Sequence, residues 1–302
     1  MGTHRHAYLI TAADNFYVLE RLLGMLDDPR NDIFVHVDAK TREVDIESLT
    51  AKCRRSTVTF VPRLKVYWGD FSQVRACMRL LRVASEGAYS YYHLLSGSDL
   101  PLKTQDEIHE FFDDHAGTEF IHFAPVQHPE WVEKVHLRNR FPFLNRGRMI
   151  SAARSRCRRV VSGALTAGRR LWPGRPQLEL KYGSDWWSIS RPMALHLLAS
   201  EQLVERLLRR AFIPTEFYVQ TIAWNSRHRD RLSEPALGNM RLIDWSRPST
   251  SNGSSPHVWR SQDMPALMQS ECLFARKFLA DIDKDVVDEL YARLAPPRHS
   301  RA

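Results

Sequence analysis

The chain has 302 residues, of which 43% are hydrophobic and 26% are charged. These values are typical of a folded globular protein with one large core or two modest ones, and they exclude global disorder. Basic residues exceed acidic ones by eight, but the excess is local, because eleven arginines and no lysine or acid lie between Arg138 and Arg175. The remainder carries 32 basic against 35 acidic side chains, so we expect no nucleic-acid partner.

The arginine run has more than one interpretation. It is consistent with a solvated basic face or with a mobile insertion spanning residues 126–180. It also has the charge of a contact surface for an anionic membrane or an acidic glycan.

The cysteines and the termini indicate a compartment. Four cysteines stand singly at positions 53, 77, 157 and 272, without a paired spacing that would hold zinc, and they are typical of reduced thiols. Neither a signal peptide nor an apolar run of about 18 residues is present. We therefore expect a cytoplasmic protein, at most peripheral at the inner face of a membrane.

Short apolar runs alternate with helical patterns through the first 125 residues. Strands are predicted at 7–11, 33–37, 57–61, 91–95 and 120–123, and helices at 16–26, 72–84 and 104–112. The last helix opens with the capping-box pattern of Thr104 and Glu107. This alternation predicts an α/β fold with a mainly parallel sheet, whose ligands bind beyond the carboxyl ends of the strands.

After the arginine run the pattern is mixed. Strands are predicted at 186–190, 241–245 and 272–278, and helical stretches from 193, from 203, at 215–224 and at 283–294. Residues 246–257 are predicted to form a loop and residues 296–302 a disordered tail. No dinucleotide fingerprint or P-loop is present, which disfavours those nucleotide-binding classes.

Three blocks carry the chemistry: Gly-Ser-Asp-Trp-Trp at 183–187, Pro-Thr-Glu-Phe-Tyr at 214–218 and Phe-Ala-Arg-Lys-Phe at 274–278. Carboxylates beside large aromatic residues suit a site that binds a sugar and removes a hydroxyl proton. An Arg-Lys pair between apolar residues suits a diphosphate. Together the blocks predict transfer of a sugar from a nucleotide donor.

With these blocks the chain resembles the core-2/I-branching β-1,6-N-acetylglucosaminyltransferases and the related peptide O-xylosyltransferases. Further matching blocks are Phe-Val-His-Val-Asp at 34–38, Tyr-Trp-Gly at 67–69, Ser-Gln-Val at 72–74, Tyr-His-Leu-Leu-Ser-Gly-Ser-Asp-Leu-Pro-Leu-Lys-Thr at 92–104 and Asn-Ser at 225–226. The 183–186 and 274–278 blocks look more like the xylosyltransferase branch.

The resemblance implies a variant GT-A glycosyltransferase fold, with a mixed, mainly parallel sheet flanked by helices. It implies a single glycosyltransferase domain over 1–295, with a nucleotide-binding half (1–125), the Arg-rich insertion (126–180) and an acceptor and diphosphate half (181–295). It further implies a UDP-sugar donor, inversion to a β linkage and no metal cofactor. N-Acetylglucosamine is the first choice of sugar and xylose the second, with a glycan or glycoconjugate hydroxyl as acceptor.

The residues themselves agree with a metal-free reaction. Metal-dependent relatives hold a divalent ion with an Asp-x-Asp after a strand, but here the equivalent place reads Asp38-Ala39-Lys40. Arg276 and Lys277 are expected to neutralise the leaving diphosphate instead. Because successive side chains of a strand point to opposite faces, both can reach one diphosphate only if the strand bends or ends there.

Glu216 matches the catalytic base of the N-acetylglucosaminyl branch, and Asp185 matches an acid proposed for that region in the xylosyltransferase branch. Either one is the base and the other orients the acceptor, with Glu216 the first choice. The structural alternatives are a first-turn glutamate that complements a helix dipole and a loop aspartate bound to backbone amides.

The remaining site predictions concern the donor and the acceptor. Donor-binding candidates, beside Arg276 and Lys277, are Thr11, Asp38, Trp68, Gly69, Ser96 and Asp99. Trp186 is predicted to stack on the acceptor sugar, in which case Trp187 belongs to the core. Two rival functions stay open at this point: a glycoside hydrolase using Asp185 and Glu216, and a non-catalytic basic module that binds acidic polymer or membrane.

Overall fold

The computed structural model describes residues 4–125, 178–250 and 255–296. Its strands are β1 (His6–Ala12), β2 (Asn31–Val37), β3 (Thr57–Phe60), β4 (Tyr91–Ser96), β5 (Asp99–Pro101), β6 (Phe120–Ile121), β7 (Trp187–Ser190), β8 (Arg241–Ile243) and β9 (Phe274–Arg276). Its α-helices are α1 (Phe16–Met25), α2 (Ile46–Thr50), α3 (Phe71–Ala84), α4 (Gln105–Asp114), α7 (Arg191–Ala199), α8 (Glu201–Leu208), α9 (Tyr218–Trp224), α10 (Met264–Gln269) and α11 (Asp285–Leu294). Short 3₁₀ turns are η2 (Pro214–Glu216), η3 (Arg229–Arg231) and η4 (Ser261–Asp263).

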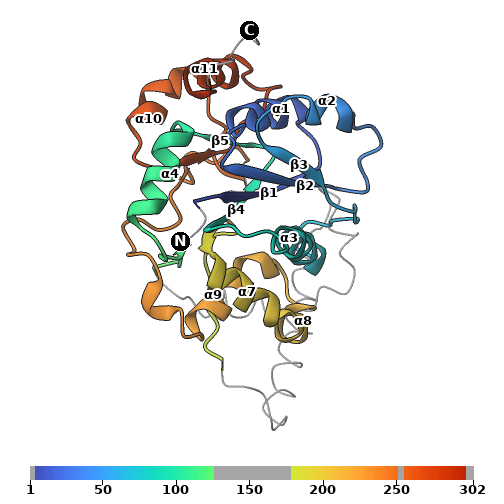
Figure 1. The fold of residues 1–302 in the computed structure, drawn as a ribbon, viewed down its shortest axis with the longest axis vertical. Helices are drawn as coiled ribbons and strands as arrows, with labels where there is room; N and C mark the ends of the chain where they lie inside the picture. Colours follow the sequence, from blue (N-terminus) through green and yellow to red (C-terminus); the bar gives the residue numbers. More distant parts are fainter. Residues whose placement is uncertain (1–3, 126–177, 251–254, 297–302) are drawn as a thin grey trace.

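The main sheet has six strands in the order β3-β2-β1-β4-β7-β6, of which Figure 1 labels the first four. The first four are parallel, and β7 runs antiparallel to both β4 and β6. The α/β class with a mixed, mainly parallel sheet between helices, as predicted from the sequence, is therefore confirmed.

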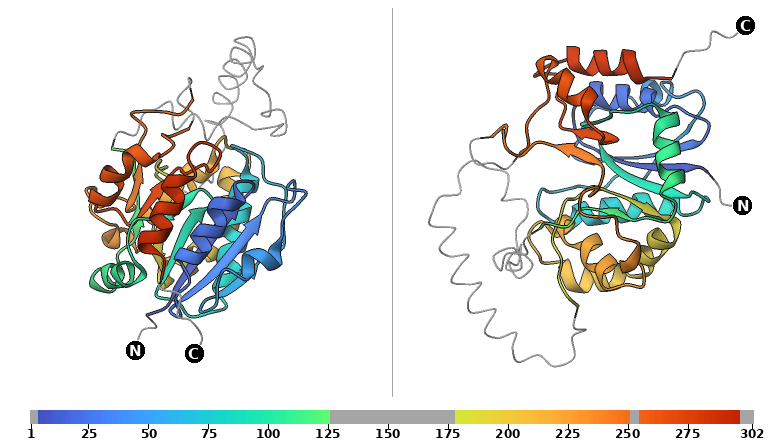
Figure 2. Two further views of the ribbon diagram at one scale, coloured as in Figure 1. Left: turned by 90° about the horizontal axis from the view of Figure 1, so that it is seen from above. Right: turned by 90° about the vertical axis from the view of Figure 1, so that its left-hand side faces the viewer.

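The sheet is buried on both faces, as parallel sheets require. Along β1, Tyr8 and Ile10 pack into one apolar cluster, whereas Ala7 and Leu9 pack into the other, which follows from the two-residue period of a strand. Helices α1 and α11 cover the first face, and α3, α7, α8 and α9 lie on the second (Figures 1 and 2). The right-hand view of Figure 2 shows the three layers edge on.

A second sheet of three strands, ordered β5-β9-β8, stands beside the first. Strand β5 starts three residues after β4 ends, so the second sheet begins at the carboxyl end of β4. Strand β9 pairs antiparallel with β5 and parallel with β8. The second sheet therefore brings the C-terminal part of the chain to the carboxyl edge of the first.

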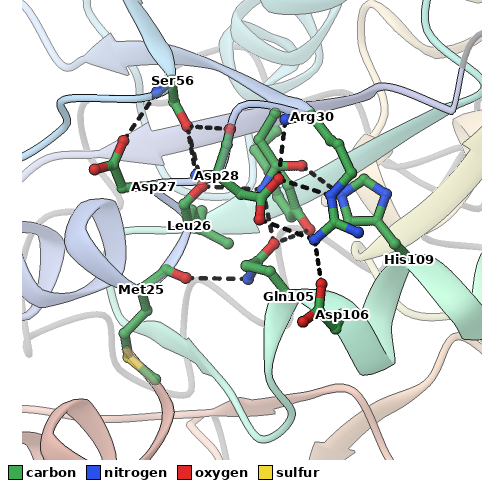
Figure 3. Close-up of polar contacts among 11 residues, drawn as sticks. Met25, Leu26, Asp27, Asp28, Arg30, Ser56, Gln105, Asp106 and His109 are labelled. Atoms are coloured by element: carbon green, nitrogen blue, oxygen red, sulfur yellow. Dashed lines mark hydrogen bonds and ion pairs between the residues drawn. The ribbon is translucent and has the colours of Figure 1, made fainter. Parts of the chain in front are cut away.

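The amino edge of the main sheet is closed by a polar network, which we call the amino-edge network: Asp28, Arg30, Asn31, Gln105, Asp106 and His109. Figure 3 shows Arg30 between Asp28 and Asp106, with Gln105 donating to the carbonyl of Met25. The Asn31 amide donates to Gln105 and to the carbonyl of Leu26, and its oxygen lies 2.9 Å from Nε2 of His109. These contacts join β2 to α4.

Most predicted elements lie within a residue or two of their expected bounds, and the capping box of Thr104 and Glu107 is present. The predicted strand at 272–278 is shorter, because only Phe274–Arg276 pair with neighbours. The short elements α2, β5 and α10 were not predicted. The arginine run and residues 297–302 lie outside the described residues, so the predictions made for them stay predictions.

Three of the four cysteines, Cys53, Cys77 and Cys272, are free thiols, as expected; Cys157 lies outside the described residues. No helix in the described part of the chain has the length and apolar character needed to cross a membrane.

Candidate active site

The carboxyl edge of the main sheet brings together the first predicted site residues. Thr11 near the end of β1 pairs with His36 on one side and with Ser96 on the other. The carbonyl of Ala12 accepts a hydrogen bond from the amide of Asp38, at 2.8 Å. Thr11, Asp38 and Ser96 are thus neighbours because three parallel strands end side by side.

The turn after β4 holds an acid that fixes Arg276. Asp99 accepts hydrogen bonds from the Ser96 amide (2.8 Å) and the Ser96 hydroxyl (2.7 Å). Nη1 of Arg276 donates to Asp99 at 2.7 Å and also contacts the Ser96 hydroxyl. Within the described part of the chain, Nε and Nη2 of Arg276 make no hydrogen bond. One side of the guanidinium is therefore anchored, and its other nitrogens can still donate to a ligand.

Strand β9 ends at Arg276, so Lys277 lies just beyond the regular strand. The strand therefore ends at the pair, which is the condition under which Arg276 and Lys277 can serve one diphosphate. Burial, followed by the charge of Arg276, lowers the pKa of Lys277, while Asp14 and Asp99 partly counteract this. A partly desolvated ammonium beside a guanidinium favours an incoming anion.

Asp185 and Trp186 reach the same edge because β7 is antiparallel to β4. Ser188 pairs with His93, so the residues that precede β7 lie toward the carboxyl end of β4. The guanidinium carbon of Arg276 stands 4.4 Å from the centroid of the Trp186 ring, in cation–π geometry. Trp187 is fully buried, as predicted, and its indole donates to the Tyr218 hydroxyl. Trp186 thus contacts the cation expected to bind the diphosphate.

Burial raises the pKa of Asp185, and the Thr215 hydroxyl and the Arg276 charge offset part of this rise. Thr215 and Asp185 nevertheless do not reach hydrogen-bond geometry, and both Oδ1 of Asp185 and Oγ1 of Thr215 are buried without a partner in the described structure. Buried polar atoms are usually satisfied, and these two atoms are available to hydrogen-bond a ligand that binds beside Arg276.

Glu216 ends the turn η2, next to the Asp185 segment. Its carbonyl accepts a hydrogen bond from the amide of Gly183 at 2.9 Å. A Cβ on Gly183 would lie 1.8 Å from the carbonyl oxygen of His122, so only glycine allows this close approach. Burial, and then the charge and hydrogen bond of Glu216, raise the pKa of Tyr182. The two predicted acids therefore belong to one cluster.

Asp38 is held by its own loop. Its side chain accepts from the amide of Lys40 at 2.9 Å and from that of Val66 at 3.3 Å, and it forms an ion pair of 3.0 Å with Nζ of Lys40. The carboxylate is 8% exposed. Lys40 thus stands where an Asp-x-Asp motif has its second acid, and its ammonium is paired with the Asp38 carboxylate.

Trp68 and Gly69 form the turn before α3. Trp68 is 57% exposed and meets Phe212 edge to face, with ring centroids 5.5 Å apart. Gly69 has a φ of +70°, and a Cβ there would lie 2.8 Å from the Phe212 ring. The turn displays an aromatic surface next to α3.

Sequence reasoning missed four residues of this region. Tyr182 and Thr215 border the two acids, and Asn239 and Arg241 lie behind them. Thr215 stands inside the recognised 214–218 block, next to Glu216. A charged residue such as Arg241 at the start of an apolar strand was a signal that could have been used, since a buried arginine needs several hydrogen-bond partners.

A model of the Core-2/I-Branching enzyme family matches residues 6–269. The chain belongs to this family. Among curated proteins it is similar to Xylosyltransferase oxt of Drosophila melanogaster (23% identity over 92% of this chain and 32% of that protein) and to Xylosyltransferase 2 of Bos taurus (23%, 90% and 31%). It is also similar to Xylosyltransferase sqv-6 of Caenorhabditis briggsae (23%, 89% and 34%). The chain thus spans about a third of the length of these relatives.

Among solved structures, apo mouse Xyloside xylosyltransferase 1 aligns with a TM-score of 0.39 and 12% identity, over 90% of this chain and 96% of that one. The recognition of the family from the sequence is confirmed by the family match. The individual site residues stay predictions, now with the geometry given above.

Proposed function

We propose that this chain transfers a sugar from a UDP-sugar to a hydroxyl group of a glycan or glycoconjugate, with inversion and without a metal ion. One observation carries the proposal: β7 and β9, distant in the sequence, bring a buried carboxylate with a raised pKa (Asp185) close to a cationic pair (Arg276 and Lys277) at the carboxyl edge of the sheet. A base and an anion site in one place are what an inverting transfer from a diphosphate needs.

The leaving diphosphate would meet Arg276 and Lys277. Arg276 is held by Asp99 and Ser96 through Nη1, so its remaining nitrogens are oriented before a ligand arrives. The two carboxylates of an Asp-x-Asp motif need a bound metal cation. Here the ammonium of Lys40 is paired with Asp38 and supplies a positive charge at that place, which supports the metal-free part of the proposal.

We assign the role of base to Asp185 and the role of orienting the acceptor to Glu216, which reverses the preference from sequence alone. Burial raises the pKa of Asp185 and the charge of Arg276 offsets part of this rise, so Asp185 is the acid placed beside the expected diphosphate site. A pKa raised toward neutrality strengthens a base that is still ionised at working pH. Glu216 instead interacts with Tyr182.

The choice of which donor sugar to test first rests on the relatives rather than on the site. The curated relatives given above are xylosyltransferases, which supports testing UDP-xylose before UDP-N-acetylglucosamine. The hydrolase and binding-module alternatives lose support from membership in a family of branching enzymes. A cytoplasmic location and membrane contact through the arginine run remain proposals, and sedimentation with anionic vesicles at low salt tests the latter.

Calorimetric titration with UDP in excess EDTA tests the proposal. We expect saturable binding to the wild type, loss of binding in an Arg276→Ala/Lys277→Ala variant, and unchanged binding in Lys284→Met, a control that removes an exposed lysine paired with Asp288 on α11. Binding that requires Mn²⁺ would contradict the metal-free mechanism. No binding with or without metal would contradict a nucleotide donor and favour a hydrolase or a binding module.

A further inference from the structure

Two buried side chains behind the candidate active site, Asn239 and Arg241, hold the segment that follows Asp185. Nδ2 of Asn239 donates to the carbonyl of Trp186 at 3.0 Å. Nη2 of Arg241 donates to the carbonyl of Trp187 at 3.0 Å, and Nη1 donates to the Ser188 hydroxyl at 2.8 Å. Three consecutive residues of the chain are thus fixed by two side chains.

The same two residues belong to the other half of the site. Arg241 opens β8, and β8 pairs in parallel with β9, where Ile243 lies opposite Arg276. The Arg241 guanidinium also stands 4.9 Å from the ring centroid of Phe274, on β9. The backbone of this segment is therefore built into the sheet that carries Arg276, while its side chains bind the strand that follows Asp185.

Burial of the Arg241 guanidinium costs desolvation free energy. Arg241 is 7% exposed, and burial lowers its pKa to about 10. In the described part of the chain no carboxylate forms an ion pair with it, and its Nε has no hydrogen-bond partner. A well-packed apolar side chain would avoid this desolvation cost, so the hydrogen bonds of Arg241 need a reason beyond stability.

We propose that Asn239 and Arg241 are positioning residues that fix Asp185 and Trp186 against Arg276. The inference rests on the proposed function, because it assigns the two residues to sugar transfer. Arg276 has its own anchor in Ser96 and Asp99. Loosening Asn239 or Arg241 therefore displaces the acid and the tryptophan while the diphosphate site stays in place.

The first test is Asn239→Ala together with Asn239→Asp, which keeps the shape and the acceptor oxygen but loses the donor to Trp186. We expect kcat for UDP-sugar turnover to fall roughly 10- to 100-fold in both, since a misplacement of about 1 Å can cost that much. The KM for the donor and the Kd for UDP are expected to stay within about twofold of wild type, because Arg276 keeps its anchor.

The second test is rescue at position 241. Lys at this position keeps the charge and can still donate to part of the carbonyl and hydroxyl set, whereas Met can donate to none of these groups. We expect Arg241→Lys to retain more kcat than Arg241→Met when both are assayed well below their melting temperatures.

The matched control is Asn31→Ala, which removes a buried amide with equally well-formed hydrogen bonds at the opposite edge of the sheet. We expect a comparable fall in melting temperature and an unchanged kcat. A readout without substrate is the indole N–H resonance of Trp186, assigned with Trp186→Phe, which should shift in Asn239→Ala and not in Asn31→Ala.

The positioning role would be overturned if the Trp186 resonance did not move in Asn239→Ala. It would also be overturned if the kcat of Asn239→Ala, relative to wild type, were no lower than that of Asn31→Ala. A wild-type protein that neither binds UDP nor turns over a UDP-sugar would instead overturn the proposed function. In that case the resonance alone still decides whether Asn239 positions Trp186.

Discussion

Each edge of the main sheet holds an arginine paired with a carboxylate, but the two arginines differ in how many of their hydrogen-bond donors are used. At the amino edge Arg30 binds Asp28 with two hydrogen bonds, of 2.8 and 2.9 Å, and Asp106 with a third of 2.6 Å. At the carboxyl edge Arg276 contacts its partners through Nη1, and within the described residues its Nε and Nη2 make no hydrogen bond. The first arginine joins elements of the scaffold, whereas the second keeps hydrogen-bonding capacity for a ligand.

Chain topology explains why the two edges differ. At the amino edge, α4 directly follows the second sheet's first strand and packs its Gln105 and His109 against residues that precede or open β1 and β2. At the carboxyl edge, the cationic pair comes from a segment that lies 60 residues after Glu216 and 91 residues after Asp185, counted to Arg276. Their meeting depends on β7 and β9, which enter their sheets out of chain order.

The largest expected effect is at the carboxyl edge. Asp185→Asn should lower kcat roughly 10³-fold, because an amide cannot accept the acceptor proton, and Glu216→Gln about tenfold, through orientation alone. Since burial raises the pKa of Asp185, wild-type kcat should fall as the pH drops through that raised pKa, and the remaining activity of Asp185→Asn should lack this limb. Steady-state release of UDP measures both. A larger loss in Glu216→Gln than in Asp185→Asn would exchange the two roles.

A pair of arginine and lysine variants separates binding from scaffolding. Lys277→Met should weaken UDP binding about tenfold with little change in melting temperature, because one charge contact to a phosphate is lost. Arg30→Met should leave UDP affinity unchanged but lower the free energy of unfolding by about 3 kcal/mol, because Asp28 keeps a buried charge without its partner. Calorimetry and urea unfolding measure the two quantities. Equal losses of stability in both variants would remove the distinction between the edges.

The sequence could predict the strands, the helices and the three chemical blocks, because these depend on local periodicity and residue type. It also predicted that Trp187 belongs to the core, and the structure confirms this. It could not predict that β7 is antiparallel or that β5, β8 and β9 form a separate sheet, since both depend on pairing between distant segments. The contact of Trp186 with Arg276 and the hydrogen bonds on which the proposed roles of Asn239 and Arg241 rest follow from that pairing.

The amino-edge network adjoins a cluster of buried histidines that predicts acid sensitivity. His6 stacks on His109 with ring centroids 4.0 Å apart and lies 4.8 Å from His93. Burial, assisted by neighbouring positive charges, lowers the pKa of all three, to about 4 for His109, although Asp28 and Asp113 partly counteract this at His109.

Because these folded-state pKa values lie below the unfolded value of about 6.5, the neutral rings favour the fold fully above pH 6.5, and this stability is lost as the pH falls from 6.5 toward 4. We expect a loss of roughly 1–2 kcal/mol per histidine at pH 5, measured by urea unfolding against pH. His109→Gln should flatten this dependence, while His4→Gln, which removes an exposed histidine, should not. A stability that is constant from pH 7 to 5 would contradict the prediction.

The smallest expected effect isolates the helix that carries the amino-edge network. The Thr104 hydroxyl accepts from the Glu107 amide, and Glu107 accepts from the Thr104 amide at 2.7 Å, so the capping box satisfies both ends of the first turn of α4. Thr104→Ala should lower the free energy of unfolding by about 1 kcal/mol. Thr104→Ser should keep most of the wild-type stability, because the serine hydroxyl can make the same hydrogen bond. Since Gln105, Asp106 and His109 make the polar contacts of α4 named above at the amino edge, we expect UDP affinity and kcat not to change in either variant. A loss of kcat in Thr104→Ala would mean that the two edges are energetically coupled through the sheet, and the division between scaffold and site would then have to be abandoned.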